Sequence, residues 1–284
     1  MDDGLSELIE VSRNLGRRVA YVQGGGGNTS LKTADSKMFI KASGTFLADL
    51  KDAAGFLPVD WRMLRSQLND CVSEQDYSAL LAASVMVSNN SARPSIETGF
   101  HAILDKCVLH SHSIWVNLLS CTVEGENLVY SLFPQAIWIP YVTPGLALTK
   151  KISKKTGVNK KQIIFLQNHG IIISAPDPES AWAMHESVTR SIRNAYPAIT
   201  DFDETQNFTS SITTDGLLFP DQAIYHSKPE LSKTRAGYET AQACSFLLNS
   251  VAKVGLTLCY IEDSERDVLL NMESEKFRQK LVGE

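Results

Sequence analysis

The sequence lacks the features that mark membrane, secreted and nucleic-acid-binding proteins. No apolar run approaches the roughly 18 residues that a membrane-spanning helix requires. The first residues, Met1-Asp2-Asp3-Gly4, have neither the basic nor the apolar region of a signal peptide. The net charge is -5 and the isoelectric point is about 5.7, which offers no broad positive surface to a nucleic acid. We therefore expect a cytoplasmic protein that binds neither membranes nor nucleic acids.

The sequence also lacks any Cys-x-x-Cys pair. Its five cysteines are scattered: Cys71, Cys107, Cys121, Cys244 and Cys259. An odd number of cysteines without a secretion signal predicts reduced thiols. We interpret them as small core residues and look elsewhere for metal ligands.

What is present is the composition of a globular protein. Hydrophobic residues make up 43% of the 284 residues and charged residues 21%, enough for one large domain or two small ones. Polar, turn-rich residues 200–215 predict a boundary. We expect a core domain over residues 1–200 and a C-terminal extension, residues 201–284, packed on the same domain.

Hydrophobic periodicity predicts alternating helices and strands. Helices are expected at 5–18, 76–87, from Pro94 onward, 114–119, 177–194, 238–253 and 265–281. Strands are expected at 38–41, 107–112, 137–141, 162–167, 171–174, 223–225 and 256–261. Several connections are too short for a parallel crossover. The predicted fold is therefore a three-layer α/β/α domain around a mixed, mostly antiparallel sheet.

Three histidines have the spacing of a metal site. His110 and His112 stand at i and i+2 after an apolar run, so both side chains point to one side of an extended strand. His169 follows another short apolar run and precedes a glycine. Three histidines with one open position are the arrangement of a catalytic zinc or a similar divalent metal. The alternative is that two of the six histidines are neighbours by chance.

A glycine-rich segment predicts an anion-binding loop. Gly24 to Gly27 precede Asn28-Thr29-Ser30, whose hydroxyls and exposed backbone N–H groups could wrap a phosphate. The segment is not a dinucleotide fingerprint, because Thr29 stands where the third glycine would fall. No Gly-Lys-Ser/Thr follows, so it is not a Walker A loop. An unliganded tight turn is the alternative.

Two further small-residue turns and one carboxylate extend this interpretation. Ser43-Gly44 follows a predicted strand, and Ser95 lies where Pro94 is expected to open a helix whose dipole favours an anion. Glu97, in the same turn, is the candidate general base, since a carboxylate beside a metal can take a proton from a bound substrate.

The remaining histidines predict no site. His101 lies one helical turn after Glu97 and could orient it, although a core role fits better. His185 and His226 are interpreted as structural or solvated residues.

Together these segments resemble the class II aldolase/adducin family, which includes fuculose-phosphate and rhamnulose-phosphate aldolases and ribulose-phosphate 4-epimerase. The resemblance covers about residues 5–195, in the family's order. Its segments are Gly27-Asn28-Thr29-Ser30, Ser43-Gly44, Pro94-Ser95-x-Glu97, His110-Ser111-His112 and Asn168-His169-Gly170.

The resemblance implies a site and a reaction. It implies Zn²⁺, or another divalent metal, on His110, His112 and His169, with Glu97 as the acid/base. The residues it assigns to the substrate phosphate are Asn28, Thr29, Ser43, Gly44 and Ser95. The implied reaction cleaves a sugar phosphate, a ketose 1-phosphate, to dihydroxyacetone phosphate and an aldehyde through a metal-stabilised enediolate. Small aldolases of the family are cyclic tetramers, so a homo-oligomer, by resemblance a homotetramer, is expected.

Two departures keep rival functions open. Ile96 replaces a serine that many members have before the Glu, which puts the phosphate in question. Residues beyond 201, including Phe219-Pro220-Asp221, look similar to longer aldolase modules fused to dehydrogenases, but no dehydrogenase lies within the 284 residues. The rivals are a sugar-acid-phosphate decarboxylase, a methylthioribulose-phosphate dehydratase and a non-catalytic adducin-like interaction module.

Overall fold

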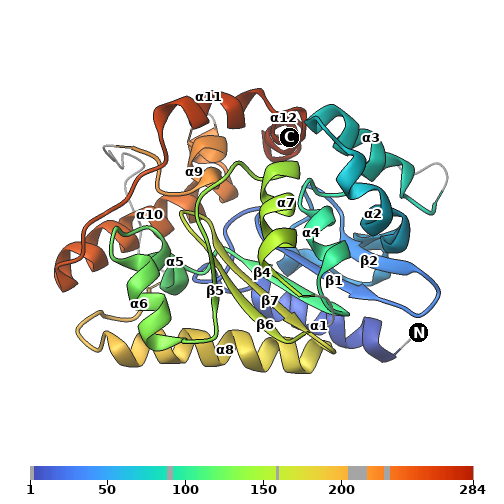
Figure 1. The fold of residues 1–284 in the computed structure, drawn as a ribbon. Coiled ribbons are helices and arrows are strands. Elements are labelled where there is room, and N and C mark those ends of the chain that lie inside the picture. Colours follow the sequence, from blue (N-terminus) through green and yellow to red (C-terminus); the bar gives the residue numbers. More distant parts are fainter. Residues whose placement is uncertain (1–2, 88–91, 158–159, 204–215, 227–230, 284) are drawn as a thin grey trace.

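One mixed sheet organises the molecule (Figure 1). The computed structural model describes residues 3–87, 92–157, 160–203, 216–226 and 231–283. Within these residues the strand order is β3-β2-β1-β4-β7-β6-β5. The strands are β1 (Asn28–Lys32), β2 (Lys37–Lys41), β3 (Phe56–Asp60), β4 (Cys107–Ser111), β5 (Ile137–Ile139), β6 (Gln162–Leu166) and β7 (Gly170–Ala175). β5 pairs with β6 in parallel and the other neighbours pair antiparallel, which confirms the predicted sheet.

Helices pack on both faces of this sheet and complete the predicted three layers (Figure 1). One face is covered by α1 (Asp3–Gly16), α5 (Ile114–Ser120), α6 (Gly125–Leu132), α8 (Pro178–Ala195) and α10 (Arg235–Val254). The other face is covered by α2 (Trp61–Gln67), α3 (Glu74–Ala83), α4 (Thr98–Ile103) and α7 (Leu146–Lys155). Short 3-10 turns occur at Leu47–Asp49, Ala53–Gly55, Leu68–Asp70 and Leu231–Lys233.

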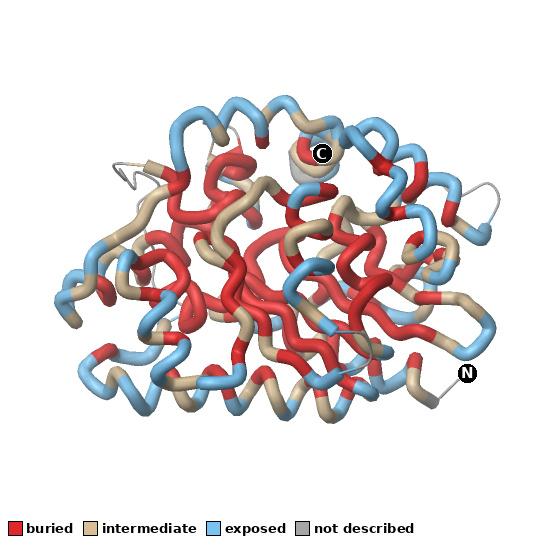
Figure 2. The backbone as a smooth tube through the Cα atoms, viewed as in Figure 1, coloured by how far each residue is buried: buried red, intermediate tan, exposed pale blue. Residues whose placement is uncertain are grey.

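The central strands are buried along their whole length (Figure 2). Alternate residues of β4 enter different cores: Leu109 belongs to the cluster that contains residues of α1 and α8, and Val108 to the cluster that contains residues of α4 and α7. Each fully buried side chain of this size contributes about 1.5–3 kcal/mol. Covering both faces in this way fixes the register of β4, which carries His110 and ends just before His112.

The C-terminal extension differs most from its sequence prediction. The expected strand at 223–225 is a helix, α9 (Pro220–Tyr225), because Pro220 occupies a first-turn position that its ring favours. The expected strand at 256–261 is reduced to single bridges at Leu258 and Ile261. The expected helix at 265–281 is two helices, α11 (Asp263–Asn271) and α12 (Glu273–Gly283), separated by Met272 in an extended conformation. Residues 204–215, at the predicted boundary, lie outside the described residues.

Two predictions in the core were also wrong. Asn28 to Ser30, expected in a loop, begin the central strand β1. Pro94 does not open a helix, because it pairs with Ala42 in an isolated bridge, and the chain then turns through Ile96 and Glu97 before α4 begins at Thr98. Ser95 therefore lies before the helix and not in its first turn.

The extension shares part of its hydrophobic packing with the core domain. Ala243, Leu247 and Val251 of α10 join the hydrophobic cluster that also contains α5 and α8. α9, α10 and α11 form a smaller cluster of their own, which reaches Phe46 and Tyr141 of the core. Among the described helices, none combines the length and apolarity that crossing a membrane requires.

Candidate active site

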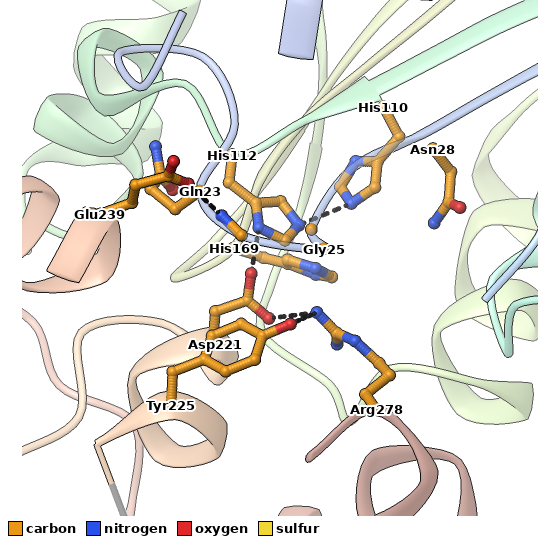
Figure 3. A network of polar contacts seen from close by, with 12 residues as sticks. Gln23, Gly25, Asn28, His110, His112, His169, Asp221, Tyr225, Glu239 and Arg278 are labelled. Atoms are coloured by element: carbon orange, nitrogen blue, oxygen red, sulfur yellow. Dashed lines mark hydrogen bonds and ion pairs between the residues drawn. The ribbon is translucent and has the colours of Figure 1, made fainter. Parts of the chain in front are cut away.

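The three predicted histidine ligands converge on one point (Figure 3). His110 lies on β4, His112 directly follows it, and His169 lies in the turn between β6 and β7. Their candidate ligand atoms all fall within 4.8 Å of one another, and the Nε2 atoms of His110 and His112 are 3.1 Å apart. Nitrogens about 2 Å from a shared tetrahedral metal would be separated by roughly 3.4 Å. The donor set therefore fits a divalent cation.

Outer contacts hold two of these rings so that Nε2 faces the common point. The Nδ1 atom of His110 lies 3.0 Å from the carbonyl oxygen of Ile171 on the neighbouring strand. The Nδ1 atom of His112 lies 2.8 Å from Oδ2 of Asp221. An N–H on Nδ1 that donates to such an acceptor leaves Nε2 as the metal-binding nitrogen.

The β6–β7 turn places the third ring. Asn168 adopts a positive φ of 51° there, and its side-chain amide donates to the carbonyl oxygens of Leu218 and Cys259. Gly170 follows, and a Cβ at that position would lie 2.2 Å from the carbonyl oxygen of Ser111. Only glycine lets β7 approach the end of β4 this closely. That approach holds His169 beside His110 and His112.

The carboxylate of Glu97 lies beside the three histidines. Its Oε1 is 3.3 Å from Nε2 of His110 and 3.4 Å from Nε2 of His169, and the amide of Asn28 donates to its Oε2 at 2.6 Å. Burial alone would raise the pKa of Glu97, but the histidines, His110 above all, lower it well below its usual range. Glu97 is therefore an ionised carboxylate positioned beside the ligand cluster.

The pKa values of His110 and His169 are shifted in opposite directions. Burial opposes protonation of His110, but the adjacent Glu97 outweighs it and raises the pKa of His110. Burial lowers the pKa of His169 to about 3. A cation at the common point would take the place of the proton on His110 as the positive partner of Glu97.

Two cationic side chains fix the helix that begins beside Glu97. Glu97 is the N-cap residue of α4. At the other end of α4, the ammonium of Lys32 donates to the carbonyl oxygens of His101 and Leu104, and Arg65 donates to that of Ala102. These bonds occupy carbonyls that lack helical partners. The position of Glu97 is thus set by contacts at both ends of the helix.

The predicted phosphate residues are only partly brought together. A cavity beside the histidines is lined by Asn28, Ser43, Gly44 and Ser95, together with the glycine loop and Ile96. Thr29 is absent from this lining, because it points to the opposite face of the sheet, where its hydroxyl meets that of Ser12 at 2.7 Å. The amide of Asn28 contacts Glu97 and Ser95, so it orients the carboxylate as well as facing the cavity.

Four charged residues at this cavity were missed from the sequence: Lys41, Asp221, Glu275 and Arg278. Lys41 is buried at the end of β2, and its ammonium donates to the carbonyl oxygens of Gly25 and Gly26. Asp221 of α9 and Arg278 of α12 line the cavity from the extension. The position of Lys41 just before the Ser43-Gly44 turn could have identified it, but no local signal marks Arg278.

The family follows from comparison with known proteins. A model of the class II aldolase and adducin N-terminal domain matches residues 6–196. The chain belongs to this family. Membership predicts a lyase-type enzyme, and the buried histidine triad adds a candidate metal site of the kind such enzymes use.

The names of individual relatives point to different reaction classes. The uncharacterized oxidoreductase YuxG of Bacillus subtilis (strain 168) is 30% identical over 194 residues, 63% of this chain but 27% of YuxG. The chain therefore spans about a quarter of the length of that relative. A 3-oxo-tetronate 4-phosphate decarboxylase of Haemophilus influenzae is 21% identical over 187 residues, 60% of this chain and 76% of the decarboxylase. Membership alone does not specify the reaction.

Solved structures agree on the fold. The N-terminal class II aldolase domain of a conserved protein from Thermoplasma acidophilum is 25% identical, with a TM-score of 0.61, over 69% of this chain and 94% of that domain. An aldolase II superfamily protein from Pseudomonas syringae is 13% identical, with a TM-score of 0.50, over 90% of this chain and 95% of its own.

Proposed function

We propose that the chain is a metal-dependent aldehyde-lyase that cleaves a ketose 1-phosphate to dihydroxyacetone phosphate and an aldehyde. The observation that carries the proposal is the carboxylate of Glu97 within 3.4 Å of two histidines of a three-nitrogen cluster. His110, His112 and His169 would hold the metal, zinc being the expected ion. The metal would act as a Lewis acid on the oxygens of a bound substrate and stabilise an enediolate.

The chain's own groups account for the proton transfer. In the condensation direction, Oε1 of ionised Glu97 removes a proton from the substrate carbon that becomes nucleophilic. In cleavage, the hydroxyl on the carbon that becomes the aldehyde loses its proton to solvent, and the electron pair of the broken carbon–carbon bond remains on the other carbon. Glu97, after taking up a proton from solvent, delivers it to that carbon. Asn28 fixes the carboxylate through its bond to Oε2, so that Oε1 faces the substrate.

The anion end of the cavity supplies the preference for a phosphate. Ser43, Gly44 and Ser95 line it, and Lys41 lies behind the glycine loop. Thr29 is left out of the proposed contacts because of its orientation. We further propose a cytoplasmic homo-oligomer, a tetramer by family resemblance, formed of the 1–200 core and its 201–284 extension.

A sugar-acid-phosphate decarboxylase is the second candidate. The Haemophilus influenzae relative is named as a decarboxylase of a sugar-acid phosphate. In addition, Ile96 lines the cavity where many family members have a serine. Such an enzyme would use the same metal ligands with a substrate that loses a carboxylate. Product analysis separates the two, because only the aldolase releases an aldehyde and only the decarboxylase releases carbon dioxide, whereas a 3-oxo-tetronate 4-phosphate that loses its carboxylate also yields dihydroxyacetone phosphate.

The test is a screen of zinc-loaded protein against ketose 1-phosphates and sugar-acid phosphates, with Glu97→Gln as the diagnostic variant. Glu97→Gln should retain metal and fold but lose turnover by roughly 100-fold or more. Carbon dioxide released from a sugar-acid phosphate, with no aldehyde from any ketose 1-phosphate, would replace the aldolase with the decarboxylase. Full activity of Glu97→Gln would show that another group moves the proton.

A further inference from the structure

We propose that Asp221 and Arg278, both from the C-terminal extension, are positioning residues for the metal-ligand His112. The inference rests on the proposed metal site. Neither residue lies in the 6–196 segment that matches the family model. They would make the extension a working part of the site rather than an addition to it.

Asp221 acts on His112 directly. Its Oδ2 lies 2.8 Å from Nδ1 of the ring, and both side chains are buried, with 1% and 4% exposure. A carboxylate that accepts a hydrogen bond from the Nδ1–H group fixes the tautomer of the ring and directs Nε2 toward the metal. It also makes Nε2 a stronger metal ligand. His110 has only a backbone carbonyl in the equivalent place, so Asp221 supplies an ionised outer partner to the cluster.

Arg278 acts on Asp221. Its guanidinium donates to Oδ1 of Asp221 at 2.8 Å and to the hydroxyl of Tyr225 at 3.0 Å (Figure 3). It also donates to Glu275, one turn earlier on α12. The two oxygens of Asp221 are therefore used differently, one on the histidine and one on the guanidinium. This arrangement holds the carboxylate in a single rotation and compensates its buried charge.

The glycine loop, Gly24 to Gly27, leaves room for the contact between Asp221 and His112. A Cβ on Gly26 would lie 2.6 Å from Oδ2 of Asp221 and 2.8 Å from Nδ1 of His112. A Cβ on Gly24 would lie 2.5 Å from Cβ of Ala236, and its N–H donates to Glu239 of α10. The small residues in this loop thus let the extension approach His112, which is a role separate from wrapping a phosphate.

The experiment measures metal affinity, not turnover. Metal-free full-length protein is titrated with Co²⁺ against a competing chelator, and binding is read from the visible bands of the bound ion. Asp221→Asn, close in size, should weaken Co²⁺ binding by about 10- to 100-fold while the protein stays folded. Arg278→Gln should give a smaller loss. The double variant should lose no more than Asp221→Asn alone, because Arg278 acts through Asp221.

A matched control and a second measurement separate the outcomes. Asp49→Asn removes the charge of an exposed carboxylate paired with Arg235 and should leave Co²⁺ affinity unchanged. Wild-type protein that binds no Co²⁺ would overturn the proposed function. A folded Asp221→Asn that binds like the wild type would overturn this inference alone. If Asp221→Asn does not fold, nitrogen NMR of the metal-free wild type decides by showing which ring nitrogen of His112 carries the proton. A proton on Nδ1 supports the inference. A ring protonated at Nε2 and not at Nδ1 contradicts it.

Discussion

Lys41 illustrates how a single residue can couple the stability of the molecule to its site. Its ammonium is fully buried under the glycine loop, where it donates to two carbonyl oxygens. Burial, with a smaller contribution from Arg278, lowers the pKa of Lys41 to about 7. An unfolded chain would return this amine to its ordinary value near 10.4.

The pKa of Lys41 predicts a pH dependence of unfolding. Between about pH 7 and pH 10 the unfolded state binds the extra proton, so wild-type stability should rise with pH, by at most about 1.4 kcal/mol per pH unit. Lys41→Met removes this proton equilibrium. Denaturant melts of the two metal-free proteins between pH 6.5 and pH 9 should therefore show wild type gaining on the variant as pH rises. A constant difference would mean that Lys41 stays protonated when folded.

At the scale of elements, local signals predicted most of the core. Buried strands such as 107–112 and 171–174, and the capped helix after Asp177, lie where their apolar patterns placed them, and Asp177 accepts from the N–H of Ser180. The histidines were singled out because His110 and His112 share one side of a predicted strand and His169 follows another apolar run, and Glu97 because it lies in a small-residue turn. Those signals depend on neighbouring residues only.

What was missed depends on contacts between distant residues. Ala223 to Tyr225 have the composition of a strand, but packing against α10 and α11 and a proline at the first turn make them helical. The pairing of His112 with Asp221 spans 109 positions, and that of Asp221 with Arg278 spans 57. No periodicity within one element can indicate such pairs.

The β6–β7 turn yields a prediction for an element. Gly170→Ala would place a methyl group 2.2 Å from the backbone oxygen of Ser111, so the strands must separate and carry His169 with them. We expect a stability loss of about 1–3 kcal/mol together with weaker Zn²⁺ binding. Gly255→Ala is the control, because Gly255 has a φ of 69° and a Cβ added there would meet no neighbouring group within 4 Å. It should lower the free energy of unfolding by about 1–2 kcal/mol and leave Zn²⁺ affinity intact. Chemical denaturation and chelator competition measure both quantities, and unchanged metal affinity in Gly170→Ala would contradict the role assigned to the turn.

At the scale of the whole molecule, the site joins parts that are far apart in sequence. The candidate ligands are His110 on β4, His112 just after it and His169 in the β6–β7 turn. The carboxylate of Glu97 lies at the N-cap of α4, and α9 and α12 provide the outer contacts. An ion bound there would connect both cores and the extension. Its binding energy should therefore appear as resistance of the entire fold to unfolding, and not as a change confined to one loop.

This linkage gives the prediction for metal removal. A ligand that binds only the folded state stabilises it by about 2.7 kcal/mol when its free concentration is 100 times its dissociation constant. Zn²⁺ added to metal-free wild type should raise the melting temperature in one cooperative transition, and a chelator should reverse the rise. The double variant His110→Ala/His112→Ala should not respond, because one remaining imidazole cannot hold the ion. Calorimetry at several Zn²⁺ concentrations makes the comparison. An equal rise in the double variant would place the stabilising ion elsewhere and remove the metal from the proposed chemistry.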